Sequence, residues 1–140
     1  MSYLLDTNVV SEVASRRPEQ RVLAWLRAVP DSALHLSVLS LGEIRQGVER
    51  LEAGARKEKL RLWLEQDLPA WFEARLLPVD AAVADRWGRL LAQARRSRPA
   101  VDSLLAATAL VHGLRLVTRN AGDFVFPGLE VVDPWNARRP

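Results

Sequence analysis

The sequence of 140 residues contains no cysteine, only two lysines (Lys57 and Lys59) and only two histidines, His35 and His112. Without cysteine, disulfides and thiolate metal sites are excluded, and a reducing, cytoplasmic setting is the simplest expectation. We expect His35 within a strand and His112 at a helix end, and interpret both as structural residues. A zinc site is therefore disfavoured.

Long hydrophobic runs are also missing. No stretch of 18 apolar residues is present, and the first residues lack the basic and apolar segments of a signal peptide, so we expect neither secretion nor a membrane span. The composition, with 49% hydrophobic and 26% charged residues, is typical of a globular protein. We predict a single domain over residues 1–136 and a disordered tail over residues 137–140.

The basic residues are almost all arginine, and the formal net charge is +3. Arginine suits phosphate because its planar guanidinium group donates two parallel hydrogen bonds. A GC-rich coding sequence would produce the same arginine-rich composition. The charge alone therefore gives only weak support for a nucleic-acid partner.

Short apolar segments alternate with amphipathic ones along the chain. The pattern predicts strands at 3–5, 34–36, 76–77, 114–118 and 130–132, and helices at 18–30, 38–51, 56–75, 83–94 and 99–112. Pro69 is expected to kink or break the third of these helices. Strands separated by helices pair in parallel, so we predict an α/β sandwich with a short central parallel sheet.

Four acidic residues stand where such a fold binds its ligands. Asp6 follows the first strand directly, and Asp123 lies just past a later strand. Asp102 opens the helix at 99–112, and Glu43 sits early in the helix that follows the second strand. Ligands of open α/β sheets bind outside the carboxyl ends of the strands. We therefore predict that the four carboxylates converge in one cleft.

Each acid also has an ordinary structural explanation. Asp6 and Asp102 are typical helix N-caps, and Asp123 follows Asn and Gly residues that favour a turn. Glu43 stands three residues after Ser40, as in a capping box, although Ser37 at the end of the preceding strand is the better cap. For any single acid, both explanations remain open.

Together the acids favour a metal site. Clustered carboxylates repel one another and cannot all stay ionised without cations, and an all-oxygen ligand set suits magnesium or manganese. Such an ion beside a phosphate supports phosphodiester hydrolysis by generating hydroxide and stabilising the attacking and leaving oxygens. Four polar residues, each also explicable as a turn or cap residue, are candidates to orient water or phosphate. They are Thr7, Asn8, Thr118 and Asn120.

Four segments resemble the motifs of VapC-type PIN-domain toxins, in particular those of the FitB-like subgroup. They are YLLDTNVVSE at 3–12, LSVLSLGEI at 36–44, DSLLAATA at 102–109, and LVTRN with DF at 116–124. The similarity runs from residue 3 to about residue 135. The metal-site acids of this family match Asp6, Glu43, Asp102 and Asp123.

Three other positions bear on the resemblance. Thr118 matches the hydroxyl position near the site, and Asn8 matches the residue behind the first acid. Ser103 departs from the pattern, because a small apolar residue, commonly alanine, is expected there.

The resemblance implies a PIN-like α/β/α fold and a magnesium- or manganese-dependent endoribonuclease that acts as the toxin of a type II toxin–antitoxin system. It also implies inhibition by a cognate antitoxin protein, and homodimers that often associate further in the complex with the antitoxin. A groove for an antitoxin helix is one explanation of four apolar residues, and ordinary core packing is the other. These residues are Val22, Leu26, Leu64 and Trp71.

Two competing interpretations fit less well. A receiver domain or a haloacid-dehalogenase-like phosphatase also uses an Asp after a strand. The phosphatase requires a second Asp where Asn8 stands, and the receiver requires a late lysine, whereas none follows Lys59. A catalytically inert PIN-like domain that binds RNA or a protein is the other alternative. A missing acid would favour it, yet all four are present.

Overall fold

The computed structural model describes residues 1–136, which fold around a five-stranded sheet of order β3-β2-β1-β4-β5. Every neighbouring pair of strands is parallel, which confirms the predicted sheet. The strands are β1 (Tyr3–Leu5), β2 (Leu34–Ser37), β3 (Leu76–Leu77), β4 (Arg115–Val117) and β5 (Val131–Val132). The predicted tail, residues 137–140, lies outside the described residues.

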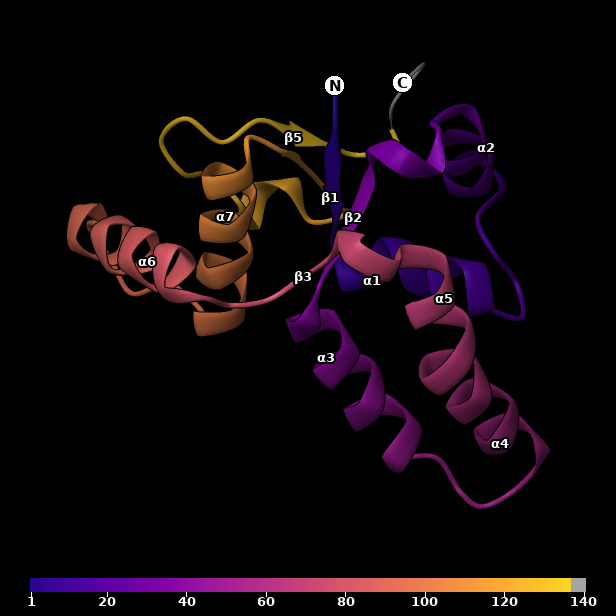
Figure 1. Ribbon diagram of the computed structural model, residues 1–140. Coiled ribbons are helices and arrows are strands. Elements are labelled where there is room, and N and C mark those ends of the chain that lie inside the picture. Colours follow the sequence, from indigo (N-terminus) through magenta and orange to yellow (C-terminus); the bar gives the residue numbers. More distant parts are fainter. Residues whose placement is uncertain (137–140) are drawn as a thin grey trace.

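Helices cover both faces of this sheet (Figure 1). They are α1 (Thr7–Val10), α2 (Gln20–Ala28), α3 (Val38–Glu49), α4 (Ala55–Leu62), α5 (Leu68–Phe72), α6 (Ala81–Gln93) and α7 (Ala100–His112). Short 3-10 turns occupy Ser11–Ala14, Asp31–Ala33, Glu73–Arg75 and Ala121–Asp123. No helix among residues 1–136 combines the length and the apolar character that crossing a bilayer requires.

Alternation along the strands divides the core into two halves. Tyr3 and Leu5 of β1 pack with α2, α3 and α5, whereas Leu4 faces α6 and α7. In β4 the same alternation sends Val117 to the first half and Leu116 to the second. Because successive strand residues point to opposite faces, these three-residue strands are sufficient to build the two apolar layers of an α/β/α sandwich.

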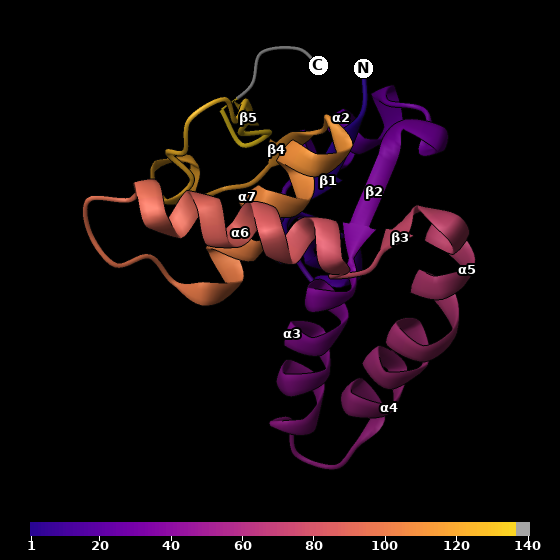
Figure 2. The same cartoon turned by 60° about the vertical axis from the view of Figure 1, so that its left-hand side comes forward.

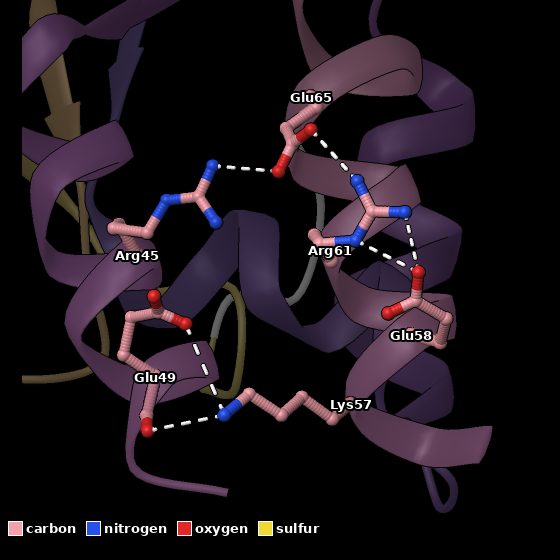
Figure 3. A network of polar contacts seen from close by, with 6 residues as sticks. All are labelled: Arg45, Glu49, Lys57, Glu58, Arg61 and Glu65. Atoms are coloured by element: carbon pink, nitrogen blue, oxygen red, sulfur yellow. Dashed lines mark hydrogen bonds and ion pairs between the residues drawn. The ribbon is translucent and has the colours of Figure 1, made fainter. Parts of the chain in front are cut away.

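The hairpin of α3 and α4 extends away from the sheet (Figures 1 and 2). Ion pairs connect its two arms (Figure 3): Arg45 Nη2 lies 2.8 Å from Glu65 Oε2, and Lys57 Nζ lies 4.0 Å from Glu49 Oε2. Arg61 pairs with Glu58 and, at 2.9 Å, with Glu65. Glu65 therefore connects an arginine of α3 to one of α4.

Pro69 distorts the predicted helix at 56–75 without ending it. A π-helical segment, Trp63–Asp67, joins α4 to α5, and the backbone N–H of Leu68 donates to Trp63 O, five residues earlier. Proline has no N–H to donate, and its ring clashes with the carbonyl four residues before it in a regular helix. The wider turn ahead of Pro69 accommodates the ring.

The last two strands are shorter than predicted, although backbone pairing continues past their ends. Thr118 N donates to Val132 O at 2.9 Å, and Leu116 N donates to Glu130 O at 2.9 Å. Leu114 instead ends the turn after α7, where its N–H donates to Ala109 O. Gly113 occupies the left-handed conformation there, with φ of 64°.

Candidate functional site

Asp6 lies at the carboxyl end of β1, beside the end of β4. Its backbone N–H donates to Val117 O at 2.8 Å. Oδ1 accepts from the Thr7 backbone N–H at 2.7 Å, which caps α1, and Oδ2 accepts from the Thr118 hydroxyl at 2.8 Å. The residue is 8% exposed. Asp6 therefore caps α1, which confirms the structural explanation, and its carboxylate also lies at the sheet edge where the metal-site explanation requires it.

Asn8 and Thr118 hold this end of β4 against Asp6. Asn8 Nδ2 lies 3.4 Å from Asp6 Oδ2 and 3.5 Å from Thr118 Oγ1, while its Oδ1 accepts from the Arg119 backbone N–H at 3.3 Å. The Thr118 hydroxyl also accepts from the Asn120 backbone N–H at 3.0 Å. Asn120 thus contributes its main chain. Within residues 1–136 its side chain makes no hydrogen bond.

Glu43 lies in the second turn of α3, on an exposed position. The helix begins at Val38, and Ser37 Oγ caps it by accepting from the Leu39 N–H at 3.0 Å. The capping-box explanation of Glu43 is therefore wrong, because the cap lies one turn earlier than Ser40. Glu43 Oε1 instead contacts the Thr7 hydroxyl at 2.5 Å.

Ser40 is a contributor that the sequence did not identify in this role. Its buried hydroxyl lies 2.8 Å from Thr7 Oγ1. A threonine hydroxyl has one hydrogen, and an ionised carboxylate can only accept, so Thr7 donates to Glu43 and Ser40 donates to Thr7. These two hydrogen bonds fix one oxygen of Glu43 relative to α1, the helix that Asp6 caps.

Asp102 is the third residue of α7, and the helix is preceded by Pro99 without a side-chain cap. The capping explanation of Asp102 is therefore wrong. The neighbouring Ser103 is buried: its Oγ accepts from Trp87 Nε1 at 2.9 Å and lies 2.9 Å from Pro99 O. A hydroxyl at this position has a use that alanine lacks, since it ties the first turn of α7 to α6.

Asp123 ends the 3-10 turn Ala121–Asp123 and is exposed. Its backbone N–H donates to Asn120 O at 2.9 Å, so the turn explanation is correct for its main chain. The side chain remains available to the site. His35 lies in β2 with Nδ1 3.3 Å from Tyr3 O, and His112 is the exposed last residue of α7, at the opposite end from Asp102.

Electrostatic coupling relates the four acids to one another. Burial raises the pKa of Asp6, hydrogen bonds from Thr118 and Thr7 oppose this shift, and the charges of Glu43 and Asp123 reinforce it. Burial also raises the pKa of Asp102, and the charges of Asp6, Asp123 and Glu43 add to the effect. The fold therefore brings all four carboxylates within electrostatic range at one edge of the sheet.

The donor chemistry of this set suits a hard divalent cation, because every candidate ligand is a carboxylate oxygen. Among residues 1–136, no three acidic or histidine side chains are already close enough to ligate one ion together. Asp123 is an exposed side chain that can change rotamer, whereas hydrogen bonds hold Asp6 and one oxygen of Glu43. The residues fit a metal by donor type and charge, with Asp6 as the fixed ligand.

An apolar groove of about 290 Å³ begins at Thr7 and Glu43 and runs between α3 and α4. Ile44, Val48, Leu60 and Trp63 are among the residues that line it. This groove does not involve the four residues for which the sequence left a groove or core packing open. Val22 and Leu64 are core residues, and Leu26 and Trp71 border a separate hollow next to α2.

Known proteins resemble this chain in both sequence and structure. The profile of the PIN domain matches residues 3–125. A VapC ribonuclease, Y4jK of Sinorhizobium fredii, is 35% identical over 94% of this chain and 96% of its own length. Toxin FitB of Neisseria gonorrhoeae is 37% identical over 95% and 98%. The crystal structure of FitAcB from Neisseria gonorrhoeae superposes with a TM-score of 0.90 at 36% identity, covering 96% of this chain and 99% of that one.

Proposed function

The chain belongs to the PIN-domain family, and we propose that it is a magnesium- or manganese-dependent endoribonuclease, the toxin of a type II toxin–antitoxin pair. The observation that carries the proposal is the site at the end of β1. There, a buried Asp6 with a raised pKa lies within electrostatic range of Glu43, Asp102 and Asp123. The names of two relatives, a VapC ribonuclease and a toxin, support the same activity.

We assign Asp6, Glu43, Asp102 and Asp123 to hold the divalent ion. When bound, the ion supplies Lewis-acid charge to the phosphate and lowers the pKa of a water. The Thr7 amide and the Thr118 hydroxyl fix both oxygens of Asp6. Thr7 likewise fixes Glu43 Oε1, which leaves Oε2 free to bind the ion.

Two other functions were considered from the sequence: a phosphoaspartate protein and a catalytically inert PIN-like domain. A phosphoaspartate protein belongs to another family, so the PIN match over residues 3–125 overturns it. A catalytically inert PIN-like domain remains the alternative. It would bind RNA or a protein without cleaving either, whether or not metal is present.

The test is RNA cleavage by the purified chain with magnesium or manganese, with excess EDTA, and after metal is restored. We expect cleavage that EDTA abolishes and added metal recovers, and none from Asp6→Asn with an unchanged circular dichroism spectrum. Undiminished cleavage by Asp6→Asn in EDTA would refute the proposal. Absence of cleavage by the wild type under all metal conditions would favour the inert domain.

We also propose that the cognate antitoxin binds in the groove between α3 and α4, with a basic side chain facing Glu43 and the other acids. Support comes from the apolar lining and from the acids at one end of the groove. Gly47 lines the groove, and a Cβ atom there would meet no heavy atom within 4 Å. Gly88 in α6 is equally open.

Gly47→Leu should therefore keep its ribonuclease activity and escape inhibition by the antitoxin, because the new side chain fills the groove. Gly88→Leu is the matched control and should remain inhibited. Full inhibition of Gly47→Leu would place the antitoxin elsewhere. The predicted homodimer is tested by light scattering of the toxin alone and of the complex.

A further inference from the structure

A second hollow, of about 450 Å³, lies away from the groove between α3 and α4. It opens between the C-terminal end of α6, the loop at 94–99 and residues 125–127, which approach one another in Figure 2. Three arginines of one loop line it: Arg95, Arg96 and Arg98. Leu90, Val125 and Phe126 supply apolar surface, and no acidic residue is in the lining.

Arg98 is held in place without having its donors satisfied. Its guanidinium carbon lies 5.1 Å from the centroid of the Phe126 ring, and Nη2 donates to Val125 O at 3.3 Å. Nε is buried and has no hydrogen-bond partner within residues 1–136. A buried, unpaired donor is costly, and such a group in a native protein requires an explanation such as a bound water or ligand oxygen.

Arg95 and Arg96 are exposed, and no ion pair connects either of them to an acid in the described part of the chain. Arg89, one helical turn before the end of α6, shows the contrast, since it pairs with Asp85 at 2.9 Å. The loop therefore presents uncompensated positive charge at a pocket without carboxylates. Such a surface is complementary to a polyanion.

The chain connects this pocket to the acidic site on both sides. Arg98 precedes Asp102 by four residues, and Val125 follows Asp123 by two. An extended chain spans about 3.6 Å per residue, which limits these Cα separations to about 14 Å and about 7 Å. A nucleic-acid strand with one phosphate at the acidic site could therefore also reach the pocket.

We propose that this pocket binds the single-stranded RNA next to the scissile phosphate, an inference that rests on the proposed ribonuclease function. Arg95 and Arg96 pair with backbone phosphates, and the Arg98 guanidinium, which lies over the buried Phe126 ring, provides with the exposed Val125 a surface for one base. Bases of single-stranded RNA stack on guanidinium planes and aromatic rings, while arginines follow the backbone. The acids cleave, and this pocket positions the strand.

The test measures binding of a labelled single-stranded RNA in EDTA, where no cleavage occurs, over a series of salt concentrations. The variant is Arg95→Gln/Arg96→Gln. Its matched control is Arg16→Gln/Arg17→Gln, an adjacent exposed pair before α2 with the same change of charge. Each phosphate contact contributes about 0.7 to the slope of log K against log salt for single strands, so the 95/96 variant should lose about 1.4.

We expect the 95/96 variant to bind on the order of tenfold more weakly near 0.1 M salt, as that slope implies, and the control to bind as the wild type does. Arg98→Lys should weaken binding while keeping the slope, because it retains the charge and loses the planar stack. Unchanged RNA affinity of the 95/96 variant, or an equal loss of affinity in the control, would overturn the proposal. This holds even if the 95/96 variant bound a protein partner more weakly. Because binding is read without cleavage, this result is independent of whether the chain proves to be a nuclease.

Discussion

At the residue scale, the Asp6 carboxylate depends on the Thr118 hydroxyl for its orientation and its charge. The hydroxyl donates to Oδ2 and lowers the pKa of Asp6 against the effect of burial. Thr118→Val keeps the shape of the side chain and removes this donor. We expect metal affinity or cleavage to fall about 10–100-fold, the range for losing a hydrogen bond behind a metal ligand.

The matched control for this change is Thr108→Val, in the buried part of α7. The Thr108 hydroxyl donates to Leu104 O at 2.8 Å, within its own helix and apart from the acids. Cleavage rates as a function of manganese concentration measure the effect. An equal loss in both variants would mean that Thr118 is important only for packing.

Asp102 gives a prediction about pH. Burial and neighbouring acids raise its folded pKa above the unfolded value, which is about 3.9 for aspartate. The folded state then holds the proton more tightly than the unfolded state does. This stabilises the metal-free protein fully at a pH below the unfolded pKa, and the stabilisation is lost as pH rises through the folded pKa. Asp102→Asn should therefore melt at least as high as the wild type in EDTA at pH 7.

The same variant should gain much less from metal. A ligand that binds only the folded state adds about 2.7 kcal/mol at a hundred times its dissociation constant. Thermal melts at pH 4 and 7, with EDTA and with manganese, give both comparisons, and Asp67→Asn, an exposed change in the π-helical segment, is the control. A clear loss of stability in EDTA with a full metal response would make Asp102 a structural residue.

At the scale of elements, the α3–α4 hairpin shows which interactions hold an arm onto the sheet. Glu65 bridges Arg45 and Arg61, but all three side chains are more than a third exposed, and exposed ion pairs contribute little to stability. Leu68, at 1% exposure, belongs to the core. Urea unfolding should show a much smaller loss of stability for Glu65→Gln than for Leu68→Ala, which should cost about 2–5 kcal/mol.

High salt separates the two contributions further. It should remove most of the difference between Glu65→Gln and the wild type, because exposed charges are screened, and should leave the effect of Leu68→Ala in place. A larger loss of stability from Glu65→Gln than from Leu68→Ala would mean that the ion pairs in Figure 3, and not core packing, hold the hairpin in place.

The helices and strands also show which parts of the fold could be predicted from the sequence. Apolar alternation and helical periodicity predicted every strand and long helix, since both report burial directly. The π-helical turn at Trp63–Asp67 was not predictable, because Pro69 is compatible with a break, a kink or a widened turn, and the packing of Leu64 and Leu68 decides among them. The place of Ser37 directly after the strand expected at 34–36 correctly predicted that it caps α3, whereas spacing alone did not show that Asp102 is no cap.

At the scale of the whole molecule, the sheet order explains how acids distant in the sequence come to the same edge of the sheet. Asp6 follows the central strand, β4 and its following turn bring Asp123 alongside, and β2 leads into α3 with Glu43. The acids were predictable because parallel strands share one edge. The groove between α3 and α4 was not predictable, because Val22 and Leu64 have the same helical spacing as groove residues, and only the assembled core separates the two.

The central claim is that these acids hold one divalent site together. Its most direct test is Mn²⁺ binding, followed by the loss of the electron paramagnetic resonance signal of the free ion, for the wild type, Asp6→Asn and Glu52→Gln. Glu52 is an exposed acid between α3 and α4, so its variant matches the loss of one negative charge away from the site. We predict that the wild type and Glu52→Gln bind alike and that Asp6→Asn binds far more weakly. Equal binding by Asp6→Asn and the wild type would contradict the account.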